Sequence, residues 1–74
     1  MDHIPSTSPR KLIRVLEKAG FVIQRQVGSH VHLRHTENGL ITRVPMHNKD
    51  LSRGFLKAIL KQAGISTDEF KKLL

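Results

Sequence analysis

Three of the five histidines lie close together in the stretch VGSHVHLRH, at positions 30, 32 and 35. Imidazole can take up and release a proton near neutral pH, because its ordinary pKa is about 6.5. Gly28 and Ser29 directly precede His30. Glycine lets a backbone approach a phosphate closely, and serine offers the phosphate a hydroxyl and an amide. The stretch therefore fits two interpretations: acid–base chemistry on a phosphate, with His30 as the candidate residue, or a strand whose histidines are only exposed polar side chains.

Two other kinds of chemistry fit these residues less well. His30 and His32 share one side of a strand, but zinc needs three or four ligands. The chain has no cysteine, and its carboxylates are all remote in sequence from this pair. A nucleophilic Ser29 with His30 as its base is awkward, because adjacent strand residues point to opposite faces. We therefore expect neither a metal nor another cofactor.

RNA suits such a site because it carries its own nucleophile, the 2′-hydroxyl. Cleavage then needs only a proton-transfer group and cations that stabilise the extra negative charge. The chain has 13 Lys and Arg against 6 Asp and Glu, a net charge of +7, and such an excess attracts polyanions. An endoribonuclease, a noncatalytic module that binds double-stranded RNA or DNA, and an interaction domain for an acidic protein all fit this charge.

The elements that must position these residues can be read from apolar spacing and turn signals. The order of elements predicts an α+β fold, α-β-β-β-α(-α), with a three-stranded antiparallel sheet and the helices on one of its faces. We expect helices over 9–19 and 51–63, a short helix from a capping box at 66–69, strands over 21–26, 30–35 and 40–44, and turns at 27–29 and 36–39.

The length of 74 residues predicts one domain, residues 1–74, with a flexible N-terminal segment over residues 1–8. The first ten residues resemble neither a signal peptide nor a membrane span. We therefore expect a cytoplasmic protein that does not bind a membrane.

The turns also predict a register that leaves one sheet face uncovered. They place His35 opposite Leu40 and Gln26 opposite His30. The side expected to carry the helices holds Phe21, Ile23, Val31, Leu33, Leu40 and Val44. The uncovered side holds Gln24, Gln26, His30, His32, Arg34, Ile41 and Arg43. We expect His35 on the packed side or at its edge, and His47 within reach of His30 beyond the corner at Pro45.

Three motifs in this chain resemble the HicA-type toxins of bacterial toxin–antitoxin systems. They are RQxGSH at 25–30, VPxH at 44–47 and LKxILKQAGI at 56–65, and the resemblance runs from Ser8 to Leu74. It implies a fold like the double-stranded-RNA-binding domain. It also implies an mRNA interferase, a ribosome-independent endoribonuclease that arrests growth and is held inactive by a HicB-type antitoxin.

The resemblance implies that His30 is the essential histidine, with Gly28 and Ser29 beside it in the motif. His47 matches a frequent family position and is expected to support the site at most. Further RNA contacts or supporting residues are expected at Arg25, Gln26, His32, Arg34 and Arg43.

Overall fold

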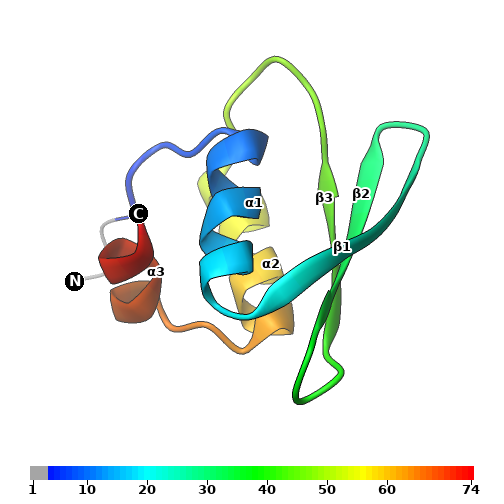
Figure 1. Ribbon diagram of the computed structural model, residues 1–74. Helices are drawn as coiled ribbons and strands as arrows, with labels where there is room; N and C mark the ends of the chain where they lie inside the picture. Colours follow the sequence, from blue (N-terminus) through cyan, green and yellow to red (C-terminus); the bar gives the residue numbers. More distant parts are fainter. Residues whose placement is uncertain (1–3) are drawn as a thin grey trace.

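The chain forms one three-stranded sheet with helices on one side of it (Figure 1), as described by a computed structural model over residues 4–74. The elements are α1 (Pro9–Lys18), β1 (Phe21–Val27), β2 (His30–His35), β3 (Ile41–Pro45), α2 (Arg53–Ala63) and α3 (Thr67–Leu73). The strands are antiparallel, in the spatial order β1-β2-β3. The predicted α+β order of elements is confirmed.

A serine caps the start of each helix. The hydroxyl oxygen of Ser8 accepts from the backbone N–H of Lys11, at 3.2 Å. Ser52 and Ser66 cap α2 and α3 in the same way. Such caps satisfy amide groups that would otherwise lack a partner in the first turn. The cap at Ser52 explains why α2 begins two residues later than the apolar pattern predicted.

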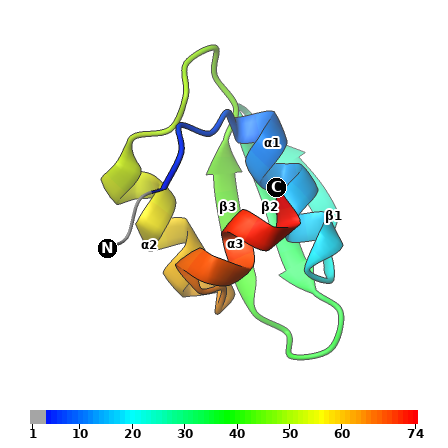
Figure 2. The ribbon, with the colours of Figure 1, turned by 90° about the vertical axis from the view of Figure 1, so that its left-hand side faces the viewer.

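The core lies between the helices and one face of the sheet, and Figure 2 views it from the helix side. The largest buried side chains come from both layers: Phe21, Leu33 and Val44 from the strands, and Leu12, Val15, Leu16, Leu56 and Phe70 from the helices. Ile23 and Leu40, expected among them, remain 49% and 38% exposed. The helices do not cover these two positions.

An irregularity in β1 changes the predicted register. Ile23 lies opposite Leu33, as expected, but Arg25 rather than Gln24 lies opposite His32. Gln24 is therefore an extra residue in β1, a β-bulge, and every later residue of the strand moves to the other face. Val27 then pairs with His30, so the predicted pairing of Gln26 with His30 is wrong. The turn contains only Gly28 and Ser29.

The N-terminal segment lies against the loop before α2. Thr7 and Leu51 form a short antiparallel bridge, in which the Leu51 N–H donates to the Thr7 carbonyl oxygen at 2.9 Å. Ile4 and Thr7 are buried. Of the segment expected to be flexible, residues 1–3 lie outside the described residues. Of the rest, Ile4 belongs to the core, whereas Pro5 and Ser6 are exposed. Within residues 4–74, no helix has the length and apolar character needed to cross a bilayer.

Candidate functional site

The sheet face that the helices leave uncovered, here called the open face, carries three rows of side chains across the strands. Residues directly opposite in an antiparallel pair share a side of the sheet. The rows are Val27, His30 and Pro45; Arg25, His32 and Arg43; and Val22, Arg34 and Ile41. The open face therefore brings together two histidines and three arginines.

His30 lies at the start of β2, at the end of this face nearest the Gly28–Ser29 turn. Gly28 has a φ of +60°, and no other described residue except glycine has a positive φ. That pattern fits a type II′ hairpin turn, which takes glycine at its first central position. The Ser29 carbonyl oxygen accepts from the Met46 N–H at 2.6 Å. The turn beside His30 is thus fastened to the end of β3.

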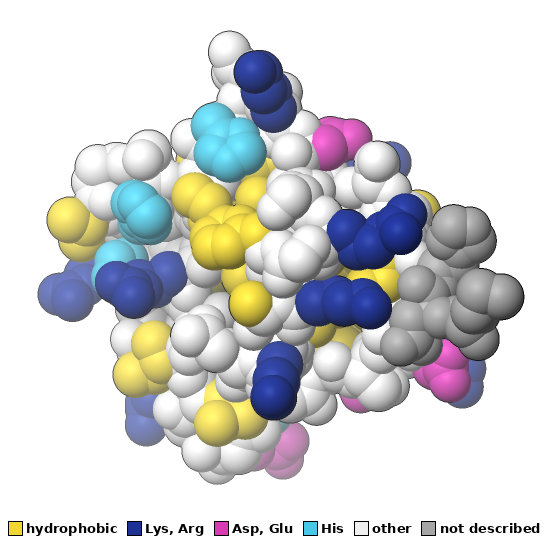
Figure 3. All heavy atoms as spheres, turned by 180° about the vertical axis from the view of Figure 1, so that it is seen from behind, with side chains coloured by type: hydrophobic (Ala, Val, Ile, Leu, Met, Phe, Trp, Pro, Cys, Tyr) yellow, Lys and Arg dark blue, Asp and Glu magenta, His cyan; other side chains and the backbone are white. Residues whose placement is uncertain are grey.

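A pocket of about 270 Å³ adjoins His30, between β3 and α2. Its lining combines an imidazole, a guanidinium and an aromatic ring with smaller side chains: His30, Arg43, Pro45, Phe55, Ala58, Ile59 and Gln62. Figure 3 shows one side of the molecule on which histidine, hydrophobic and Lys or Arg side chains adjoin one another. Acidic side chains lie elsewhere in this view.

His32 lies between two arginines in the middle row of the open face. Desolvation lowers the pKa of His32 below 6.5, and electrostatic interactions with Arg25, Arg43 and His30 lower it further. Charges of like sign disfavour the protonated ring. At neutral pH His32 is therefore an uncharged group flanked by two permanent cations.

The bulge puts Arg25 and Gln26 on the sides of the sheet opposite to those they would have in a regular strand. Arg25 joins His32 on the open face, whereas Gln26 lies opposite Val31, on the helix side. The expected placement of Gln26 on the open face is wrong. Its Nε2 donates to the Gly28 carbonyl oxygen at 3.2 Å, so Gln26 braces the turn beside His30.

The other two described histidines occupy different surroundings. His35 is partly buried, as predicted, and its Nε2 lies 3.0 Å from the Ala19 carbonyl oxygen. His47 is exposed in the loop after β3, two residues beyond the partner of His30. Among the described side-chain hydrogen bonds none joins His47 to His30. His35 belongs to the packing, and the predicted supporting role of His47 stays a prediction.

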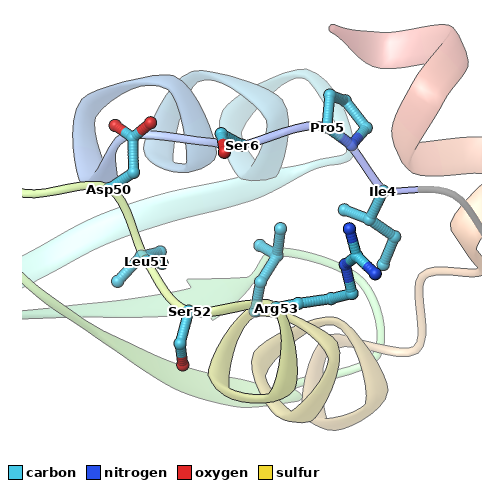
Figure 4. A pocket seen from close by; sticks show the side chains of 8 residues that line it. Ile4, Pro5, Ser6, Asp50, Leu51, Ser52 and Arg53 are labelled. Carbon is cyan, nitrogen blue, oxygen red and sulfur yellow. The ribbon is translucent and has the colours of Figure 1, made fainter.

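A larger hollow, of about 790 Å³, lies away from the histidines between the N-terminal segment and the start of α2 (Figure 4). Its lining is Ile4, Pro5, Ser6, Asp50, Leu51, Ser52, Arg53 and Leu56. In Figure 4 the Arg53 side chain extends from the start of α2 toward Ile4. This hollow has no group with an ordinary pKa near neutrality. Within residues 4–74, no three His, Asp or Glu side chains gather into a metal-binding cluster.

The sequence did not predict the pocket residues of α2 as site residues, and Phe55 is the large hydrophobic one among them that is exposed. The buried stripe of α2 is Leu56, Ile59, Leu60 and Ala63, and Phe55 lies next to it, 45% exposed. The sequence did contain one signal for Phe55. It is an aromatic residue directly before Leu56, the first residue of the apolar stripe of α2. Such a residue points to the edge of the buried face rather than to its centre.

Comparison with known protein families assigns the chain to one of them. The family model described as the HicA toxin of bacterial toxin–antitoxin systems matches residues 9–65. The chain belongs to the HicA toxin family. It is thus a toxin of the toxin–antitoxin kind, and the match spans α1, the whole sheet, α2 and every residue of the open face. The comparison with curated proteins gave no match.

Proposed function

We propose that this HicA-family toxin is an endoribonuclease, an mRNA interferase, and that His30 carries its proton transfer. The observation that supports this most directly is the position of His30. It is exposed at the end of a face with three arginines, and it lines a pocket together with Arg43. The cations attract and hold the phosphate, while the imidazole exchanges a proton with the reacting oxygens.

The proposed reaction uses the nucleophile that RNA supplies. The 2′-oxygen attacks the adjacent phosphorus as its proton passes to a base, the P–O5′ bond breaks, and the 5′-oxygen leaves with a proton. The products are a 2′,3′-cyclic phosphate end and a 5′-hydroxyl end. His30 serves as the general base or the general acid of this sequence. No step draws on a divalent ion.

The remaining site residues have supporting parts in this proposal. Arg25, Arg34 and Arg43 contact phosphates, and His32 contacts the RNA as a neutral donor or acceptor. Gly28 and Ser29 bring backbone close to the strand beside His30. Gln26 supports the reaction indirectly, through its hydrogen bond to Gly28.

The direct test is incubation of end-labelled RNA with purified protein. We expect wild type to cleave it and His30→Ala to lose about 10²- to 10⁴-fold in rate, the usual contribution of one acid–base group. Lys72→Gln, which removes an exposed charge on α3, serves as the control and should keep the wild-type rate. The reaction should continue in EDTA, and its products should carry a cyclic phosphate.

Two results would contradict the assignment. RNA left intact by wild type, yet bound with an affinity that falls steeply with salt, would make the protein a noncatalytic nucleic-acid module. Full activity in His30→Ala would move the chemistry to another residue.

We also propose that the protein acts in the cytoplasm and that its antitoxin is of the HicB type. Coexpression with a HicB-type antitoxin should relieve growth arrest caused by wild type.

A further inference from the structure

We propose that Phe55 is a stacking platform for one nucleobase of a single-stranded RNA, held in the pocket between β3 and α2. This inference rests on the proposed function in taking RNA as the substrate. It adds that the RNA is single-stranded and that Phe55 is the residue on which one of its bases stacks. The pocket places this platform and His30 in the walls of one hollow.

The exposure of Phe55 sets it apart from the other phenylalanines of the chain. Phe21 and Phe70 are 2% and 0% exposed, whereas Phe55 is 45% exposed. Successive residues of a helix point about 100° apart. Since the next residue, Leu56, is at the centre of the buried stripe, Phe55 must project sideways, toward the edge strand β3. Its ring therefore forms one wall of the pocket instead of filling the core.

The rest of the pocket matches the two chemical halves of a nucleotide. Arg43 offers a positive charge and His30 a ring nitrogen, both suited to a phosphate, whereas Phe55, Pro45 and Ala58 offer a nonpolar surface suited to a flat ring. Cation and aromatic ring in one small hollow favour a nucleotide over a purely apolar protein side chain.

Gln62 adds a polar group at the far end of this nonpolar wall. The Thr42 hydroxyl donates to Gln62 Oε1 at 3.1 Å, and Thr42 is buried beneath it. That bond occupies the amide oxygen, so the NH₂ group is the part of Gln62 that can donate to the edge of a base. The contact also ties α2 to β3 and so fixes the width of the pocket.

The geometry favours a single strand over a duplex. A base inside a helix has both faces stacked and its edge paired, so it cannot lie on Phe55 without leaving the stack. A pocket of about 270 Å³ is of the size of one nucleotide. We therefore expect cleavage in loops, ends and unpaired stretches of RNA.

Binding measurements in a cleavage-deficient background test the platform without depending on cleavage. The His30→Gln protein is titrated with a fluorescent single-stranded RNA. Adding Phe55→Ala should weaken binding about 5- to 100-fold, the usual effect of removing one base-stacking side chain. Phe55→Trp should restore it, because indole also stacks. Leu74→Ala is the matched control, since Leu74 is 48% exposed on another part of the surface.

A second measurement identifies the base itself. RNAs with one abasic site at successive positions are bound to the His30→Gln protein. We expect one position at which loss of the base weakens binding, and this effect should vanish in Phe55→Ala. A fully paired duplex should bind more weakly than the single strand and should not respond to the Phe55 substitution.

Two outcomes would overturn the platform. They are equal affinity of the Phe55→Ala protein and its parent for every RNA, and a duplex that binds as well as the single strand. If the proposed endoribonuclease function is wrong, the measurements give a different result. In that case the wild-type protein binds single strands through Phe55 but leaves them uncut.

Discussion

At the scale of single residues, the side chain of His35 connects the end of α1 to the sheet. His35 Nδ1 accepts from the backbone N–H groups of Glu37 and Asn38, at 3.1 and 3.2 Å. Its Nε2 therefore carries the hydrogen and donates to the Ala19 carbonyl oxygen at 3.0 Å. The ring also meets Phe21 edge to face, with centroids 5.0 Å apart. One side chain thus fastens the end of α1 and the β2–β3 turn.

Removing this ring should cost stability. His35→Ala is expected to lower the free energy of unfolding by about 2 kcal/mol, since it deletes one partly buried hydrogen bond, two exposed ones and an aromatic contact. Urea denaturation at neutral pH measures this. His47→Ala removes an exposed histidine and should change stability by less than about 0.5 kcal/mol. Equal effects of the two substitutions would show that the His35 contacts contribute little.

His32 predicts a pH dependence whose direction follows from its surroundings. Its pKa is lowered in the folded protein by desolvation and by Arg25, Arg43 and His30. As pH falls below 6.5, the unfolded chain takes up the proton first, so His32 makes the protein less stable toward acid. NMR titration should give a midpoint below 6.5 that rises in Arg43→Gln and stays unchanged in Lys72→Gln. A midpoint that does not respond to Arg43 would contradict this arrangement.

At the scale of elements, the bulge in β1 decides which side chains share the open face. Without it, regular alternation would put Gln24 opposite His32 and Arg25 opposite Val31. The extra residue shifts Arg25 into the middle row instead. Bulges that redirect a side chain are most frequent at sheet edges, and β1 is an edge strand.

Two single-residue deletions test the role of the bulge. Deleting Gln24 should give a regular strand in which Arg25 still lies opposite His32. Deleting Gln26 should also give a regular strand, but with Gln24 opposite His32 and Arg25 on the helix side. The His32 pKa should therefore stay low in the first variant and rise in the second, by NMR titration, and only the second should lose RNA affinity.

Equal behaviour of the two deletion variants would contradict this account of the bulge. Circular dichroism and thermal melts of both provide the folding control.

At the scale of the whole molecule, much of the fold could be predicted because its signals are local. Serine caps, glycines after helices and the change from a 3.6-residue to a 2-residue period mark each element without reference to the rest of the chain. The pairing of β2 with β3 could also be predicted, since the turn at 36–39 sets the register. Val31 does lie opposite Val44, and Leu33 opposite Thr42.

The features that the sequence did not predict depend on contacts between distant parts of the chain. The bulge leaves no mark in the alternation of residues 21–26, because polar and apolar residues occupy both faces there. The bridge from Thr7 to Leu51 joins segments more than forty residues apart. The pocket beside His30 is formed in part by α2. The angle between α2 and β3 cannot be predicted from the spacing of residues. The sequence therefore predicts which residues are candidates for the site better than it predicts which side chains lie beside them in the folded protein.

The hairpin that carries His30 extends beyond the helices (Figure 1), and residues 22–30 are all exposed. The edge strand β1 is held there by its hydrogen bonds to β2, and none of the described helices packs against the half of β1 nearest the turn. Its backbone amides should therefore exchange with solvent well before those of the core. His30 is also paired with β3, and the adjacent Ser29 is bonded to Met46. Local opening of β1 would therefore expose an unpaired edge of β2 while His30 keeps its place on β3.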